Sequence, residues 1–276
     1  MAKFEPVTGP GFPISSVSDG GFWQLLPLGG AVPVKLLDGN GLTVGLSLHD
    51  SRSPGVGFHE TVLAGANHRE IWISGLQRGL HHVRAYDPED QIDRAELFVN
   101  VVPLKTVTVA CYFPPGVQPW DVDDLTRRAN IIWKPANVTI KPIGDPKQTG
   151  DPGVHLPKQI ELNDMAIQRQ LKSLSFGNTD GADVLVYFLW TIADSSKRIT
   201  NGETIGDMIV IDSAAHGPAE RDRMAHTFAH EIGHFISGQG PSHDDLPTDL
   251  MYQEALHSVS LGTNIRRARA LRIMRF

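Results

Sequence analysis

The chain has 276 residues, of which 41% are hydrophobic and 20% are charged. This length exceeds the commonest domain size of about 100–150 residues, so the first expectation is two domains, each with its own apolar core. The formal net charge of −6 provides no global basic field for a phosphate backbone, which argues against nucleic-acid binding. The single cysteine, Cys111, excludes an internal disulfide and a cysteine-rich zinc site. Any metal must therefore be held by His, Asp or Glu.

The sequence shows neither a secretory signal nor a membrane span. Its start, Met1–Pro6, lacks the apolar core and the small-residue cleavage pattern of a signal. The longest apolar run, Val184–Ile192, is far shorter than the about 20 residues that a helix needs to cross a bilayer. We therefore expect a protein that is cytoplasmic or exported by a signal-independent route, as a bacterial effector would be.

Up to about residue 104, the chain consists of short β-segments separated by turns, and no stretch has a helical period. The clearest segments are Val32–Leu37, Leu42–Leu48, Glu70–Ser74, His81–Tyr86 and Ala95–Val102. Asp38–Gly41 is typical of a tight hairpin turn and would join the first two segments. This spacing predicts an all-β sandwich. Ser74–Tyr86 also resembles the turn and strand of bacterial Ig-like repeats, which implies an Ig-like β-sandwich domain over residues 1–104 that could bind a partner.

Beyond residue 104, strands and helices alternate, which is typical of an α/β layer. Strands are expected at Thr106–Phe113, Ala136–Pro142, Asp183–Ile192 and Met208–Asp212, helices at Val122–Trp133 and Glu161–Leu174, and a loop at residues 144–157. The strand at Asp183–Ile192 is apolar at nearly every position, so both of its faces should be covered. Residues 105–276 are thus predicted to form an α/β (α+β) domain.

A further helix is predicted to begin near His216, because Pro218 suits the first helical turn. Its apolar residues recur at intervals of three and four, at Met224, Phe228, Ile232, Phe235 and Ile236. The helix should end near Ser237, because Gly238 and Gly240–Pro241 force a sharp exit.

The residues that indicate chemistry lie on this helix, in the sequence His230-Glu-Ile-Gly-His234. Two imidazoles one helical turn apart can reach one cation, while Glu231 can reach a water bound to that cation. Imidazoles without thiolates suit zinc. The ion would lower the pKa of the water, Glu231 would accept its proton, and the hydroxide would attack a carbonyl that the ion polarises. The pattern predicts amide hydrolysis with one zinc ion and no covalent intermediate.

A catalytic zinc needs a third protein ligand and an open position. The exit turn after Gly238 would return the chain toward the two histidines and deliver His243 as that ligand. A nearby carboxylate is the alternative, from Asp244, Asp245, Asp249 or Glu254. His226, one turn before His230, is either a ligand, a partner of a ligand or a half-buried core residue.

His230–His234 and the later sequence Asp249–Tyr252 resemble the metzincin metallopeptidases. The resemblance covers about residues 106–276 and implies a zinc endopeptidase with a C-terminal helix, here Thr263–Met274. By this resemblance His230, His234 and His243 hold zinc, Glu231 is the catalytic base, and Met251 lies below the metal as an apolar floor. It also implies that an extended peptide substrate pairs with an edge strand near Ile199–Ile205.

Two positions depart from the metzincin pattern. The third histidine of the family would fall at position 240, where this chain has Gly240, so His243 requires an insertion in the turn. The tyrosine that some members use for the oxyanion would fall at Gln253, and Tyr252 is the neighbouring candidate here.

Two other functions remain open from the sequence. A zinc ion closed by four protein ligands would be structural or inactive, and the protein would then be a binding or adhesion protein. The same residues would also suit a metal-dependent amidase that acts on non-protein substrates such as peptidoglycan.

The arginines near the C-terminus are expected to form a solvated face, and they are Arg266, Arg267, Arg269, Arg272 and Arg275.

Overall fold

The fold is taken from a computed structural model, which describes residues 3–6, 15–16, 22–37, 45–48, 55–61, 69–86, 89, 92–114, 116–117, 119–144, 147–148, 159–162, 164–174, 181–193, 199–217, 219–238, 243 and 250–251. These residues form two compact units. The first holds the described residues up to Lys105 together with Lys134–Asn137, and the second holds Thr106–Trp133 and the described residues from Val138 onward. Mixed sheets with few helices make the arrangement α+β. Among the helices that the structure describes, none is both long and apolar enough to cross a membrane.

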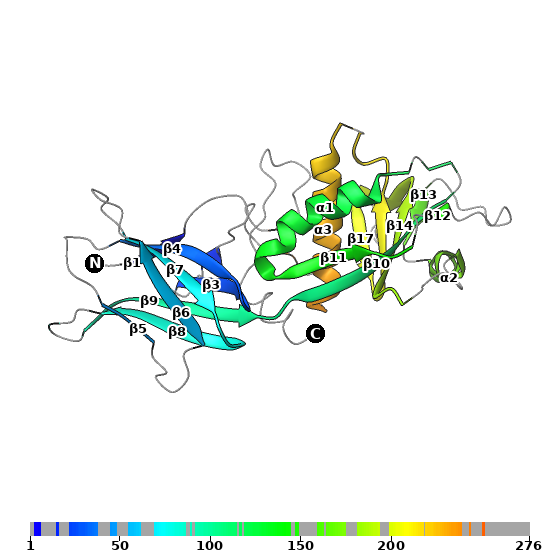
Figure 1. The fold of residues 1–276 in the computed structure, drawn as a ribbon. Coiled ribbons are helices and arrows are strands. Elements are labelled where there is room, and N and C mark those ends of the chain that lie inside the picture. The colour runs from blue at the N-terminus through cyan, green and yellow to red at the C-terminus, as the bar shows by residue number, and fades with distance from the viewer. Residues whose placement is uncertain are drawn as a thin grey trace. The chain divides into compact units, whose positions relative to one another are not determined.

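The first unit contains two β-sheets (Figure 1). One sheet has the order β1-β4-β7-β6 and consists of β1 (Lys3–Pro6), β4 (Ala31–Leu37), β7 (Arg69–Gly75) and β6 (Val56–Thr61). The other has the order β2-β3-β9-β8-β5 and consists of β2 (Ser15–Ser16), β3 (Phe22–Pro27), β9 (Asp93–Val102), β8 (Gly79–Tyr86) and β5 (Gly45–Leu48). Neighbouring strands are antiparallel except β3 and β9, which are parallel.

Alternating apolar residues of both sheets meet in one core. Every second residue of β4 and β9 contributes, namely Val32, Val34, Leu36, Leu97, Val99 and Val101. Because successive side chains of a strand point to opposite faces, this alternation gives each sheet one apolar face. The strands predicted at the corresponding segments are confirmed, with ends that differ by at most three residues.

The expected hairpin at Asp38–Gly41 is wrong. The strand before it, β4, pairs with β1 and β7, whereas the strand after it, β5, pairs with β8 in the other sheet. The connection therefore crosses between sheets, and its residues 38–44 lie outside the described part of the chain. Asp-Gly and Asn-Gly favour a local reversal, but the apolar faces that meet in the core select the partner of each strand.

The second unit is organised around a mixed sheet of order β11-β10-β14-β18-β17. Its strands are β10 (Lys105–Phe113), β11 (Val138–Pro142), β14 (Val184–Leu189), β17 (Gly202–Ile205) and β18 (Met208–Asp212), and β12 (Lys147–Gln148), within the segment expected to be a loop, pairs with β10. β10, β14 and β18 run parallel, and β17 is an antiparallel strand at the edge. A smaller sheet has the order β13-β15-β16 and consists of β13 (Gln159–Glu161), β15 (Thr191–Ala193) and β16 (Ile199–Thr200).

The larger sheet is covered on both faces. β14 is buried at all of its positions, as its apolar sequence predicts. Leu185, Tyr187 and Leu189 share a core with Leu171 of α2 (Met165–Leu174). The alternate residues point to the opposite face, where α1 (Val122–Trp133) packs against α3 (Arg221–Ser237), and α3 contacts β17 and β18 (Figure 1). This packing places α3 beside the edge strand. A short 3-10 helix, Lys134–Ala136, follows α1.

The helix expected at Glu161–Leu174 begins later, at Met165. Glu161 instead belongs to β13. The backbone N–H of Ala166 donates to the Asp164 carboxylate at 2.7 Å, so Asp164 satisfies an otherwise unpaired donor in the first turn. This cap starts the helix four residues after the predicted start.

The strands predicted to start at Thr106 and Ala136 start at Lys105 and Val138, and two further elements differ more from the prediction. The strand expected at Asp183–Ile192 divides into β14 and β15, which belong to different sheets. The helix expected to begin near His216 begins at Arg221, after the N-cap residue Glu220. The Glu220 carboxylate accepts a hydrogen bond from the backbone N–H of Gly217 at 3.2 Å, which stabilises a turn before the helix.

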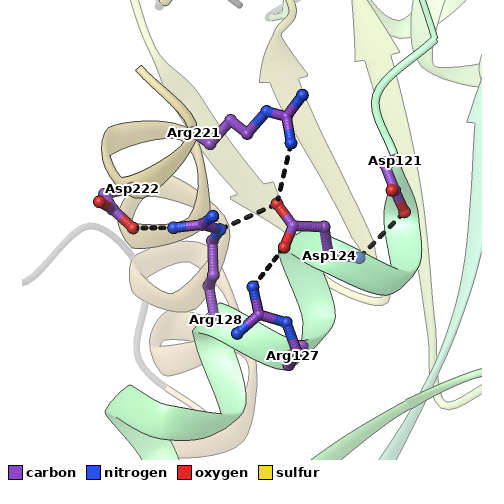
Figure 2. A network of polar contacts seen from close by, with 6 residues as sticks. All are labelled: Asp121, Asp124, Arg127, Arg128, Arg221 and Asp222. Atoms are coloured by element: carbon purple, nitrogen blue, oxygen red, sulfur yellow. Dashed lines mark hydrogen bonds and ion pairs between the residues drawn. The ribbon is translucent and has the colours of Figure 1, made fainter. Parts of the chain in front are cut away.

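A network of charged side chains joins α1 to the start of α3 (Figure 2). The Asp124 carboxylate accepts hydrogen bonds from Arg128, at 2.8 Å, and from Arg127. Arg128 also pairs with Asp222 of α3, and the Arg221 guanidinium nitrogen Nη1 lies 3.9 Å from Asp124 Oδ2. The hydrogen bonds from Arg128 and Arg127 lower the pKa of Asp124, so this carboxylate is ionised through the neutral range.

We expect Asp124→Asn to lower the melting temperature at pH 7 more than Asp123→Asn, which removes an equal charge from the same helical turn. Because the pKa of Asp124 is lower when folded, its stabilisation is present above the unfolded value of about 3.9 and is lost as the pH falls through the folded value. Thermal unfolding of both variants and the wild type at several pH values tests this. A difference between the variants that persists unchanged at pH about 2 contradicts the assignment.

Candidate metal centre

The helix α3 presents two of the predicted metal-binding residues, His230 and His234, in its last two turns. It ends at Ser237, as expected, and Gly238 follows with φ 59° and ψ 21°, a left-handed C-cap. The expected apolar stripe is buried at Met224, Phe228, Ile232 and Ile236, while Phe235 is half-buried. The stripe holds the helix against the core of the second unit, so the histidines are carried by a rigid element.

Three imidazoles converge at the C-terminal end of α3. One ring nitrogen from each of His230, His234 and His243 lies within 4.8 Å of the other two. The Nε2 atoms of His230 and His234 are 3.1 Å apart. The His243 ring stacks on His230 with centroids 5.3 Å apart and meets the edge of His234 at 5.0 Å. The structure therefore brings together three nitrogens that could hold a metal ion.

A backbone carbonyl orients the first of these rings. His230 Nδ1 lies 2.8 Å from the carbonyl oxygen of Leu250. A carbonyl only accepts hydrogen bonds, so Nδ1 carries the proton and Nε2 of the neutral ring keeps its lone pair. Burial lowers the pKa of His230 well below its usual range and His234 lowers it further, while the Leu250 carbonyl opposes them. The ring is therefore neutral at pH 7, as a metal ligand must be.

Met251 and Trp133 support α3 between the two histidines. A Cβ atom at Gly233 would collide with Met251 Sδ and would lie 3.2 Å from Trp133 Cζ2. The Trp133 indole N–H donates to the carbonyl of Ala229 at 3.0 Å. Both supporting side chains are buried. The absence of a side chain at Gly233 lets Met251 pack directly on the backbone that carries the histidines.

The carboxylate of Glu231 is buried against the edge strand β17. Glu231 is 4% exposed, and Thr204 Oγ1 lies 2.7 Å from its Oε2 and 3.0 Å from its backbone carbonyl. Burial raises the pKa of Glu231 to about 8, while the Thr204 hydroxyl opposes the rise and Glu203 adds to it. One hydroxyl proton serves only one acceptor fully, so a protonated Glu231 that donates to Thr204 would satisfy both contacts.

The other candidate residues fall into two groups. His226 is buried within α3, and the described groups that could hold a metal do not include it. The remaining predictions lie outside the described residues, and they concern Asp244, Asp245, Asp249, Tyr252, Glu254 and the helix at Thr263–Met274. The choice between His243 and a neighbouring carboxylate as third ligand therefore stays a prediction.

Cys111 is buried, and burial raises the pKa of its thiol to about 12, so no reactive thiolate is present at neutral pH.

The residues that hold this site in place were not predicted from the sequence. Gly202, Thr204, Trp133 and Leu250 all contact α3 or its histidines from distant parts of the chain. Leu250 contacts His230 through its backbone carbonyl, so the identity of its side chain gives no indication of this contact in the sequence. Gly202 and Thr204 lie two residues apart and share one face of a strand, which could have been noticed only once β17 was known to lie beside α3.

Comparison with known proteins gives distant structural likenesses. No family model and no curated protein matches the sequence. Archaemetzincin from Methanopyrus kandleri is 18% identical, with a TM-score of 0.39, over 62% of this chain and 94% of that chain. The titin domains Z1Z2 in complex with telethonin are 14% identical, with a TM-score of 0.21, over 40% of this chain and 57% of that chain. A chimeric titin Z1Z2 with a decorin peptide is 15% identical, with a TM-score of 0.20 over the same shares.

Proposed function

We propose that this chain is a zinc-dependent endopeptidase in which His230, His234 and His243 hold one zinc ion and Glu231 is the general base. The observation that carries the proposal is the convergence of three imidazoles within 4.8 Å at the end of the helix that also carries Glu231. Three ligands leave a coordination position for water or substrate, which distinguishes a catalytic zinc from a structural one.

The donor set fits zinc in chemistry and in spacing. Two nitrogens bound tetrahedrally at about 2.0–2.1 Å lie about 3.3–3.4 Å apart, close to the 3.1 Å between the Nε2 atoms of His230 and His234. All three ligand nitrogens, including that of His243, lie within 4.8 Å of one another. The hydrogen bond from His230 Nδ1 to the Leu250 carbonyl supplies the outer partner that metal-bound imidazoles usually have.

The residues of the chain would share the reaction in a defined way. Zinc, when bound, acts as a Lewis acid that lowers the pKa of water and polarises a carbonyl. Glu231 would accept the proton of the attacking water and then donate it to the leaving amine. The dication would also favour the ionised form of Glu231, against the effect of burial. A peptide substrate would pair with the edge strand β17, which lies beside α3.

We further propose that residues 1–104 form an Ig-like sandwich and that residues 105–276 form a metzincin-like catalytic domain. Two sheets that share one apolar core support the first assignment. The first unit would bind a partner or deliver the catalytic unit to its target. The histidine cluster, the supporting Met251 and the edge strand support the second assignment.

Zinc-dependent hydrolysis tests the proposal directly. We expect the purified chain to bind one zinc ion and to cleave an unstructured protein such as casein, with activity lost to a chelator and restored by zinc. His234→Ala should lose zinc and activity together, because it removes a ligand, whereas His81→Ala in β8 removes an imidazole from the first unit and should leave both unchanged. Elemental analysis measures the zinc content, and mass spectrometry of the products measures the hydrolysis.

The alternatives predict other results in the same assay. A zinc ion that raises the melting temperature greatly and supports no hydrolysis of any amide indicates a structural site in a binding protein. Hydrolysis of peptidoglycan fragments without hydrolysis of proteins indicates an amidase. Either result contradicts the endopeptidase proposal.

A further inference from the structure

We propose that Thr204 and Gly202 of the edge strand β17 are positioning residues for the general base, because together they hold the Glu231 carboxylate in one orientation. This inference rests on the proposed function, since it assigns a role within the same reaction. It concerns β17, which is remote in sequence from the metal-binding residues and was expected only to align substrate.

Thr204 contacts both ends of Glu231. Its hydroxyl lies 2.7 Å from the carboxylate Oε2 and 3.0 Å from the backbone carbonyl of the same residue. A group that bridges the backbone and the tip of one side chain restricts its rotamer. The β-branched Thr204 has few rotamers itself, and pairing with Ile209 of β18 fixes its backbone. The position of the Glu231 carboxylate is thus fixed relative to the sheet as well as to the helix.

Gly202 provides the space in which the carboxylate lies. A Cβ atom at this position would lie 2.7 Å from Glu231 Oε1, 2.8 Å from Cγ and 2.9 Å from Cδ, closer than real contacts allow. The described glycines with a positive φ do not include Gly202, so its backbone conformation is open to any residue. The requirement for glycine is therefore one of space, imposed by Glu231.

The spacing of the two residues follows from strand geometry. Side chains alternate along a strand, so Gly202 and Thr204 face α3 together, and Glu203 between them points to the opposite face. The lack of a side chain at Gly202 leaves room for the Glu231 carboxylate, and two residues later the Thr204 hydroxyl binds this carboxylate. Because the outer edge of β17 is the proposed place of substrate pairing, one strand would fix the substrate and the base relative to each other.

The test compares three variants of β17 with one control. Thr204→Val keeps the shape and the β-propensity but removes the hydroxyl, Thr204→Ser restores it, and Gly202→Ala occupies the space of the carboxylate. Thr126→Val is the control, since Thr126 is buried in α1 and its hydroxyl has no partner among the described residues. kcat, KM and zinc content are measured for each chain.

We expect Thr204→Val and Gly202→Ala to lower kcat about 10- to 100-fold, with KM and zinc content within twofold of wild type. Thr204→Ser and Thr126→Val should retain wild-type kcat. A metal-free measurement gives a second readout. Thr204→Val should lower the melting temperature of the zinc-free chain, and this loss should shrink in a Glu231→Ala background, because the two side chains are then no longer coupled.

Wild-type kcat in Thr204→Val, or a loss confined to KM, overturns the positioning role while the proposed function stands. Equal melting-temperature losses from Thr204→Val in both backgrounds overturn the contact itself. A wild-type chain that binds zinc and hydrolyses no peptide overturns the proposed function, and the positioning of a base with it.

Discussion

Glu231→Gln is expected to lower zinc-dependent hydrolysis by about 10²- to 10⁴-fold, the range that a positioned general base contributes. Glutamine has nearly the same shape and can still hydrogen-bond to Thr204, so the fold and the histidine cluster should be preserved. It cannot accept a proton from water at neutral pH, so the chemical step should slow while zinc content stays at wild type. Steady-state kinetics on a peptide substrate and elemental analysis of the same samples measure both quantities.

Glu220→Gln is the matched control for this variant. Glu220 is the N-cap residue of the same helix, and its carboxylate pairs with Arg223 at 3.2 Å, away from the histidines. The same chemical change there should leave kcat and zinc content unaltered. Hydrolysis at the wild-type rate in Glu231→Gln would show that another group deprotonates water, and the assignment of Glu231 would be withdrawn.

Gly233→Ala is expected to destabilise the second unit by about 1–3 kcal/mol, the usual cost of adding a methyl group to a packed core. The new Cβ would collide with Met251 Sδ and would lie 3.2 Å from Trp133 Cζ2. The thioether is flexible and can move, but Met251 is 1% exposed, so it has little free space around it. Urea unfolding of the zinc-free chain measures the change without a contribution from metal binding.

A double-variant cycle identifies the cause of that loss. Met251→Ala alone should cost about 2–5 kcal/mol because it leaves a cavity. Combined with Gly233→Ala, the loss should be smaller than the sum by about 0.5–3 kcal/mol, because the added methyl group then enters the cavity. Gly217→Ala is the control, since a Cβ there approaches nothing closer than 4.0 Å. Strict additivity of the two changes would mean that Met251 does not pack on Gly233.

Patterns within a single element were predictable from the sequence. The bounds of α1 and β18 agree with the prediction, and α3 ends at Ser237 with a left-handed Gly238, because helical periodicity and the conformational freedom of glycine act locally. His230 and His234 lie one turn apart for the same reason. The approach of His243 was also expected, because a sharp exit at Gly238 returns the chain toward the helix.

Tertiary structure decided which elements meet. No local pattern distinguishes a hairpin at Asp38–Gly41 from a crossing between sheets, because the partner of a strand depends on apolar faces contributed by distant segments. Contacts between distant segments also orient His230, through the Leu250 carbonyl, and bury Glu231 against Gly202 and Thr204. The sequence by itself determined which imidazoles and which carboxylate the helix could offer for a metal site. Only long-range packing decided their surroundings, since burial and hydrogen bonding depend on neighbours that are far apart along the chain.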